Sequence, residues 1–174
     1  GDETYISDIY LDPIHYYESG EWKEIDTTFR QQEDEFVVNK NSVKLFLKQV
    51  FGQHFINLSD GYIKYTAINA NPVRGVAAKD TLTYTNAWND VDVKYTAGIN
   101  GLKEDIILKS QASNTFSFSL ETSFNAVQQG NNIIFYKGPD PIAAVSAPTI
   151  IDADGNSGPI SFQLSGNTIQ ISAD

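Results

Sequence analysis

Hydrophobic and polar residues alternate with a period of two along most of the chain, and dipeptides typical of turns separate the alternating stretches. Such alternation places one face of a strand in a core and the other face in solvent. No stretch keeps the i, i+3, i+4, i+7 spacing of apolar residues that an amphipathic helix requires. The pattern therefore predicts an all-β protein.

Five turns predict β-hairpins in which apolar residues pair on one face. The turns are Ser19-Gly20, Asp60-Gly61, residues 98–101, Gly130-Asn131 and Gly166-Asn167. The predicted cross-strand pairs are Tyr17 with Trp22, Ile14 with Ile25, Leu58 with Ile63, Ile56 with Tyr65, Leu164 with Ile169, Phe162 with Ile171, Val91 with Leu108, Val93 with Ile106, and Tyr95 with Glu104. The fourth turn joins residues 124–128 to residues 133–136.

Many short antiparallel strands at intervals of roughly 8–12 residues are typical of an antiparallel β-sandwich. Residues 67–81 carry scattered polar and small side chains and are expected to form an irregular crossover. Prolines bracket residues 142–147, which suits an edge strand. No linker and no repeat of fixed period divides the chain, so residues 1–174 are expected to form a single domain.

The composition excludes some classes of partner and site. The formal charge of −10 opposes nucleic-acid phosphates and anionic membranes, so we expect neither as a partner. The absence of cysteine excludes disulfides, thiolate zinc sites and cysteine nucleophiles. No apolar run reaches the length of a membrane span, and no signal-peptide pattern opens the chain, so any targeting segment is expected outside it.

Catalytic and metal-binding motifs are sparse. His15 and His54 lack a second ligand at metal-binding spacing, and the common hydrolase, phosphate-loop and dinucleotide motifs are missing. The sequence therefore predicts that the chain is not an enzyme and needs no cofactor, with a two-carboxylate glycoside hydrolase as an alternative. Asp152, Asp154 and Asn156 resemble the start of a calcium loop, although a polar β-turn explains them as well.

Four aromatic residues are candidates for contact with a ligand. Trp22, Trp88, Tyr16 and Tyr17 could form a platform for sugar rings if they were exposed. Their alternation with aliphatic residues favours packing in the core or between sheets. A carbohydrate-binding module is thus the alternative to a structural one.

Glu104 falls on the apolar face of its predicted hairpin, opposite Tyr95. Burying this carboxylate without a partner would destabilise the folded state by roughly several kcal/mol, because the charge would lose its hydration. We therefore expect Glu104 to be paired with a tyrosine hydroxyl, with backbone N–H groups, or with a base such as Arg74 or Lys103.

Several segments resemble a recurring β-rich module of large bacterial surface proteins of the Rhs/YD-repeat and wall-associated type, in which a DNRLRE-type domain often neighbours it. The segments are residues 20–27 (GEWKEIDT), 84–95 (YTNAWNDVDVKY), 101–108 (GLKEDIIL), 116–120 (FSFSL) and 147–156 (APTIIDADGN). They occur in a consistent order over about residues 12–174. The Tyr-Pro-x-x-Ile-Asp-Pro ending of that module is absent, so a stand-alone relative such as a phage virion protein is the alternative.

The resemblance implies a non-catalytic structural or interaction module located outside the cell, on the cell surface or in a virion. Its implied partners are other domains of a larger protein or assembly, with a glycan as a further option. No catalytic residue carries over. Asp92, Tyr95, Lys103 and Glu104 match the family pattern without assigned chemistry, and a structural role is expected for them.

Overall fold

The structure is a computed structural model that describes residues 12–110 and 114–173. All regular secondary structure in these residues is β-strand, and every pair of neighbouring strands is antiparallel. The predicted all-β class is confirmed. None of the described residues forms a helix long and apolar enough to cross a membrane.

The largest sheet has eight strands in the order β18-β19-β12-β7-β6-β5-β4-β3. Its strands are β3 (Arg30–Gln32), β4 (Glu35–Val38), β5 (Lys44–Lys48), β6 (Gln53–Leu58), β7 (Gly61–Ala67), β12 (Thr115–Thr122), β18 (Ile160–Ser165) and β19 (Thr168–Ala173). Consecutive hairpins build the run from β3 to β7, whereas β12 reaches β7 and β19 from distant parts of the chain.

A second sheet has four strands in the order β11-β10-β9-β8, and a third has the order β13-β14-β15. Their strands are β8 (Gly75–Ala78), β9 (Thr81–Trp88), β10 (Val91–Gly98), β11 (Gly101–Leu108), β13 (Asn125–Gln129), β14 (Asn132–Lys137) and β15 (Asp140–Val145). Two separate hairpins complete the structure, β1 (His15–Glu18) with β2 (Glu21–Glu24) and β16 (Ile150–Ile151) with β17 (Ser157–Gly158).

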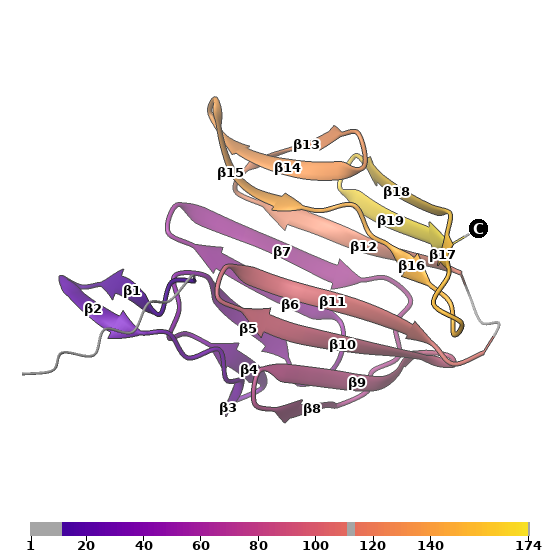
Figure 1. The fold of residues 1–174 in the computed structure, drawn as a ribbon, viewed down its shortest axis with the longest axis horizontal. Helices are drawn as coiled ribbons and strands as arrows, with labels where there is room; N and C mark the ends of the chain where they lie inside the picture. Colours follow the sequence, from indigo (N-terminus) through magenta and orange to yellow (C-terminus); the bar gives the residue numbers. More distant parts are fainter. Residues whose placement is uncertain (1–11, 111–113, 174) are drawn as a thin grey trace, which may run out of the picture.

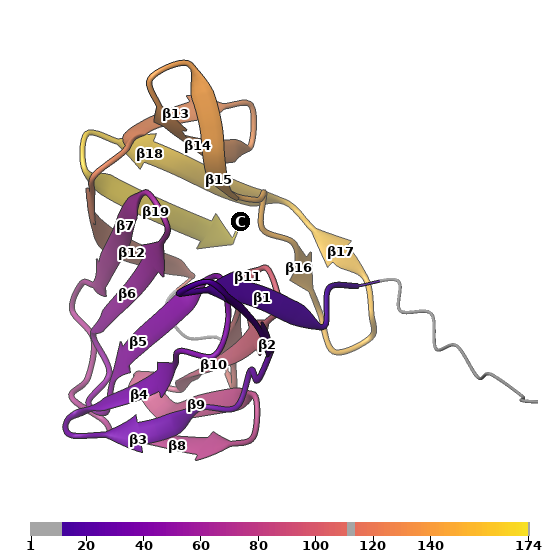
Figure 2. The same cartoon turned by 90° about the vertical axis from the view of Figure 1, so that its left-hand side faces the viewer.

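The sheets form two layers, as the predicted sandwich requires. In Figure 1 the strands β8–β11 lie across β4–β7, and Figure 2 shows the two layers from the side. The β13–β15 sheet lies near β18 and β19 at the other end. Two hydrogen bonds of the Gln128 side chain join β13 to β18. The side chain accepts from the Leu164 N–H at 2.7 Å and donates to the Phe162 carbonyl at 3.2 Å.

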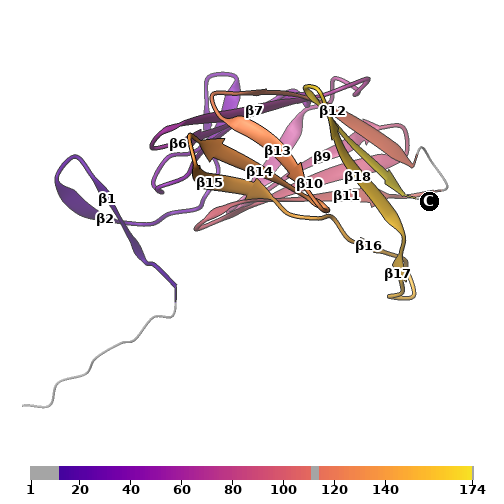
Figure 3. The same ribbon diagram turned by 90° about the horizontal axis from the view of Figure 1, so that it is seen from above.

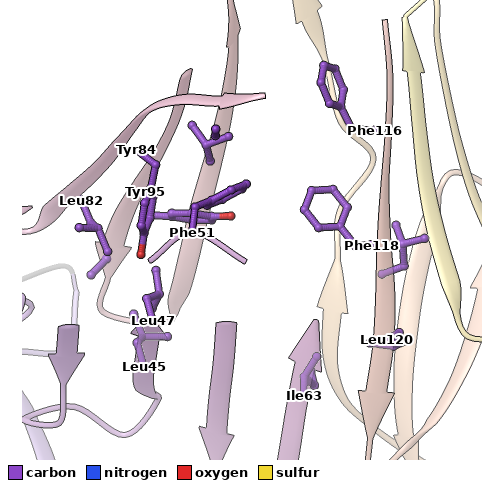
Figure 4. Packing of buried hydrophobic residues seen from close by; sticks show 14 of the residues in the cluster. Leu45, Leu47, Phe51, Ile63, Leu82, Tyr84, Tyr95, Phe116, Phe118 and Leu120 are labelled. Carbon is purple, nitrogen blue, oxygen red and sulfur yellow. The ribbon is translucent and has the colours of Figure 1, made fainter. Parts of the chain in front are cut away.

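The hydrophobic core lies between these layers and draws on strands from both. Leu45, Leu47, Phe51, Leu82 and Tyr84 pack together, as Figure 4 shows. The Tyr84 hydroxyl donates to the Lys48 carbonyl at 2.5 Å, so a polar contact also joins the four-stranded sheet to the eight-stranded one.

Four of the five hairpin registers are confirmed. The observed pairs include Tyr17 with Trp22, Tyr95 with Glu104, Gln129 with Asn132, and Phe162 with Ile171. Next to the first hairpin, the Ile25 N–H donates to the Ile14 carbonyl at 3.0 Å. These registers follow from local alternation and turn chemistry alone.

The register predicted for the Asp60-Gly61 hairpin is wrong. Ile56 pairs with Ile63 and Leu58 pairs with Gly61, so the turn residues are Ser59 and Asp60. Gly61 belongs to β7, where a Cβ atom on it would lie 2.1 Å from Oγ of Ser123 and 2.8 Å from Cζ of Phe124. The glycine therefore serves both close packing against a distant segment and a backbone φ of +157° beside the turn.

Two further expectations concern single segments. The predicted crossover at residues 67–81 is shorter than expected, because β7 extends into it and β8 lies inside it. The predicted edge strand near residues 142–147 is confirmed, since β15 lies at the edge of its sheet and pairs only with β14 among the described residues.

Candidate functional site

Two of the four candidate aromatic residues are exposed on the β1–β2 hairpin. Tyr17 is 63% exposed and Trp22 is 72% exposed. Their rings meet edge to face, with centroids 5.4 Å apart and planes at 62°. The expectation of core packing is wrong for these two residues, because the hairpin projects from the sandwich, as Figure 3 shows.

Tyr16 and Trp88 are buried, in agreement with the packing interpretation. The indole N–H of Trp88 donates to the Ile68 carbonyl at 3.1 Å, and its ring lies 4.9 Å from that of Phe116 and 5.1 Å from that of Phe51. These contacts satisfy the polar group and cover the ring. Trp88 is therefore a core residue and is not available to stack on a ligand.

The register places four exposed side chains on one face of the β1–β2 hairpin. Tyr17 lies opposite Trp22, and His15 lies opposite Glu24 on the same face. A shallow depression beside them is lined by Asp12, Pro13, Ile14, His15 and Trp22. The outward face thus combines two aromatic rings with an imidazole and a carboxylate.

The opposite face of the hairpin is attached to the body of the protein. Tyr16 on this face is buried, and Glu18 forms ion pairs with Lys23 at 3.1 Å and with Lys44 of β5. These hydrogen bonds, first from Lys44 and then from Lys23, lower the pKa of the Glu18 carboxyl. The chain then continues to Asp26, whose N–H donates to the Lys40 carbonyl at 2.9 Å.

Glu104 is half-buried, and its Oε1 accepts a hydrogen bond of 2.5 Å from the hydroxyl of the fully buried Tyr95. A tyrosine hydroxyl is one of the predicted partners, and that prediction is confirmed. Within the described part of the chain no lysine or arginine forms an ion pair with Glu104. Burial raises the pKa of Glu104 to about 7, against the lowering effect of the Tyr95 hydrogen bond.

His54 of β6 lies beside this pair and is wholly buried. Its ring centroid is 4.5 Å from that of Tyr95 and 5.1 Å from that of Tyr65, on which it stacks. Neither ring nitrogen has a hydrogen-bond partner among the described residues. Burial lowers the pKa of His54 to about 3, so the imidazole is neutral at ordinary pH.

Asp92 holds the irregular end of the β9–β10 pair. Its Oδ1 accepts from the Asn86 N–H at 2.7 Å and lies 2.8 Å from Nζ of Lys109. Asn86 has a φ of 56°, and the register shifts between Val91 and Val93. The carboxylate thus satisfies backbone at a β-bulge, and the Lys109 contact lowers its pKa.

Lys103 is exposed on the outer side of β11 and pairs with Asp105, with Nζ 2.8 Å from Oδ1. It therefore does not partner Glu104. Arg74, the other base considered, donates to Oε1 of Gln49 at 3.1 Å. We still predict a structural role for four residues, namely that their replacement lowers the stability of the fold: Asp92, Tyr95, Lys103 and Glu104.

The segment with Asp152, Asp154 and Asn156 forms the turn between β16 and β17. Oδ1 of Asp152 accepts from the N–H groups of Asp154 at 2.9 Å and Asn156 at 2.7 Å, and Oδ2 accepts from Nδ2 of Asn156 at 3.0 Å. Those bonds close a polar turn and lower the pKa of Asp152, with Asn156 the main cause. A calcium ion at this turn stays a prediction.

Two of the three comparisons with known proteins give no match: no family model matches the chain, and no solved structure matches it. The third finds a wall-associated protein of Geobacillus stearothermophilus, 24% identical over 176 residues, which are 90% of this chain and 69% of that protein. It also finds the tRNA nuclease WapA of Bacillus subtilis strain 168 and the tRNA(Glu)-specific nuclease WapA of Bacillus subtilis subsp. natto strain BEST195. Each is 24% identical over 167 residues, or 85% of this chain.

The chain is similar to bacterial wall-associated proteins. It spans only 7% of the length of each matched tRNA nuclease. The names of these nucleases overturn the prediction that the chain is not an enzyme. That prediction rested on missing motifs, which say nothing about a catalytic arrangement of residues drawn from separate strands.

Sequence reasoning missed part of both sites. The sequence assigned no site to His15 or His54, whereas His15 lies on the exposed aromatic face and His54 is buried beside Tyr95. The hairpin register already places His15 opposite Glu24, so that pair could have been found. No local pattern brings His54 to Tyr95, because β6 and β10 belong to different sheets.

Proposed function

We propose that this chain is a structural and interaction module of a bacterial cell-wall-associated protein. The observation that carries the proposal is the alignment with the Geobacillus stearothermophilus wall-associated protein over 90% of this chain. Its partners would be other segments of the same parent protein. A setting in a Rhs/YD-repeat polymer or in a phage particle stays a prediction.

Cell fractionation tests the proposed location. An antibody raised against the purified chain is used on culture medium, muramidase-released wall material, membranes and cytoplasm of the source cells. We expect the signal in the wall fraction, and in intact cells it should be removed by external protease. A signal confined to the cytoplasm would contradict the proposal.

A second candidate function is cleavage of tRNA, and the names of the matched nucleases favour it. If that activity lies within the matching stretch, the purified chain cleaves total tRNA, with fragments visible on a denaturing gel. Heat-unfolded chain is the control for contaminating ribonuclease. Intact tRNA after prolonged incubation with folded chain would remove this candidate.

A further inference from the structure

We propose that the outward face of the β1–β2 hairpin binds a neutral glycan, with the ring of Trp22 stacking against a sugar ring, the ring of Tyr17 beside it, and His15 and Glu24 bonding to its polar groups. This inference adds a ligand to the proposed module and rests on the wall location for the source of the glycan. The binding face itself is defined by the register and exposure of the hairpin residues.

The chemistry of the face fits a pyranose. A sugar ring has apolar C–H faces and a polar circumference, so it suits an aromatic surface with hydrogen-bonding groups beside it. Trp22 and Tyr17 supply the rings, and Glu24 lies two residues from Trp22 on the same face. The two cross-strand pairs are thus about 7 Å apart along the strand, which is on the order of the size of one ring.

Charge selects a neutral glycan over an anionic polymer. Asp12, Glu21 and Glu24 lie on or beside the hairpin and are exposed. Within the described part of the chain none of them is in an ion pair. Lys23 is engaged with Glu18, so the local field repels phosphate-rich polymers.

The size of the face argues against a protein partner. Two aromatic side chains can bury at most about 300–500 Å². Stable protein interfaces bury about 800 Å² on each partner. The two aromatic rings are thus too small by themselves for a stable protein contact and are sufficient for one or two sugar rings.

The hairpin is held in place before any ligand arrives. Tyr16 on the inner face is buried, and Glu18 bridges Lys23 of the hairpin and Lys44 of the body. The edge-to-face contact at 5.4 Å fixes the Tyr17 and Trp22 rings relative to each other. A preorganised platform loses less conformational entropy on binding.

Tryptophan fluorescence offers a direct test, since the two tryptophans differ in exposure. Trp22 is 72% exposed and Trp88 is 9% exposed, so acrylamide quenches Trp22 selectively. The probes are the β-1,4-linked hexamers of N-acetylglucosamine and of glucose, which separate an acetamide requirement from stacking alone. We expect at least one hexamer to protect Trp22 from acrylamide in a saturable manner.

Calorimetric titration of variants assigns the site. Trp22→Ala and Tyr17→Ala should each weaken binding by a factor of ten or more, and Glu24→Gln by a smaller factor. The matched control is Ile151→Ala, which removes another exposed apolar side chain at the β16–β17 hairpin. Circular dichroism checks that each variant is folded.

Three results would overturn the proposal. They are no saturable binding of either hexamer at millimolar concentration, equal affinity of Trp22→Ala and the unmodified protein, or Trp22-dependent binding of a lysine-rich peptide instead. Since cell fractionation measures location without reference to any ligand, a failure of glycan binding leaves the proposed wall location standing.

Discussion

The hydroxyl of Tyr95 donates a hydrogen bond of 2.5 Å to Oε1 of Glu104, directly across the β10–β11 pair. Glu104→Ala removes the carboxylate that accepts from this buried hydroxyl. We expect the free energy of unfolding to fall by about 1–3 kcal/mol, the usual penalty for an unpaired buried polar group. Urea unfolding followed by circular dichroism at pH 5 measures it.

The control for this substitution is Lys103→Ala at the neighbouring, exposed position, where the ion pair with Asp105 is lost. An exposed pair contributes little, so we expect a change of about 0.5 kcal/mol or less. Equal effects of the two substitutions would contradict the assigned role of Glu104.

Glu104 also gives the stability a defined pH dependence. Its pKa rises from 4.5 to about 7 on folding, chiefly by burial, so the folded state holds the proton more tightly than the unfolded state. The stabilising contribution is complete below pH 4.5 and is lost as the pH rises through 7. Because the side chain is partly exposed, we expect the loss to be about 1–2 kcal/mol.

Glu104→Gln tests that dependence, since it keeps the shape and cannot ionise. Urea unfolding between pH 4.5 and pH 8 should show a smaller decline for this variant than for the unmodified protein. If the free energy of unfolding fell equally with pH in both proteins, the Glu104 carboxyl would titrate alike in the folded and unfolded states, which would contradict the prediction.

His54 has the opposite effect. Burial lowers its pKa from 6.5 to about 3, so the unfolded state binds the proton first as the pH falls. Stability from this residue is present above pH 6.5 and is lost toward pH 3, by about 2–3 kcal/mol between pH 6.5 and pH 4. His54→Phe, which fits the surrounding aromatic rings, should reduce this loss in urea unfolding at those two pH values.

The other described histidine, His15, is exposed and provides the matched control. We expect His15→Gln to keep the pH dependence of the unmodified protein. If His15→Gln changed the pH dependence of unfolding as much as His54→Phe, the loss of stability in acid could not be assigned to the buried His54.

Gly61→Ala tests the close approach of β7 to the segment after β12. The new methyl group would meet Oγ of Ser123 and the ring of Phe124, so we expect a loss of about 1–3 kcal/mol from overpacking. Gly52→Ala is the control, because Gly52 has a similar φ of +154° and nothing lies within 4 Å of its added Cβ. Thermal unfolding compares them, and a harmless Gly61→Ala would contradict the packing.

Sequence alone determined the all-β class and four of the five predicted hairpin registers. Tyr17 with Trp22 and Tyr95 with Glu104 could be paired in advance because two adjacent strands and a short turn define a register locally. The same local logic failed at Gly61, where contact with Ser123 and Phe124 requires a glycine outside the turn.

Only the tertiary structure decided which faces are covered. Trp22 and Trp88 both follow alternating patterns, yet Trp22 is exposed on an isolated hairpin while Trp88 packs against Phe51 and Phe116. His54 lies against Tyr95 only because two sheets stack. A period of two tells which residues share a face, whereas burial depends on whether strands distant in sequence lie opposite that face.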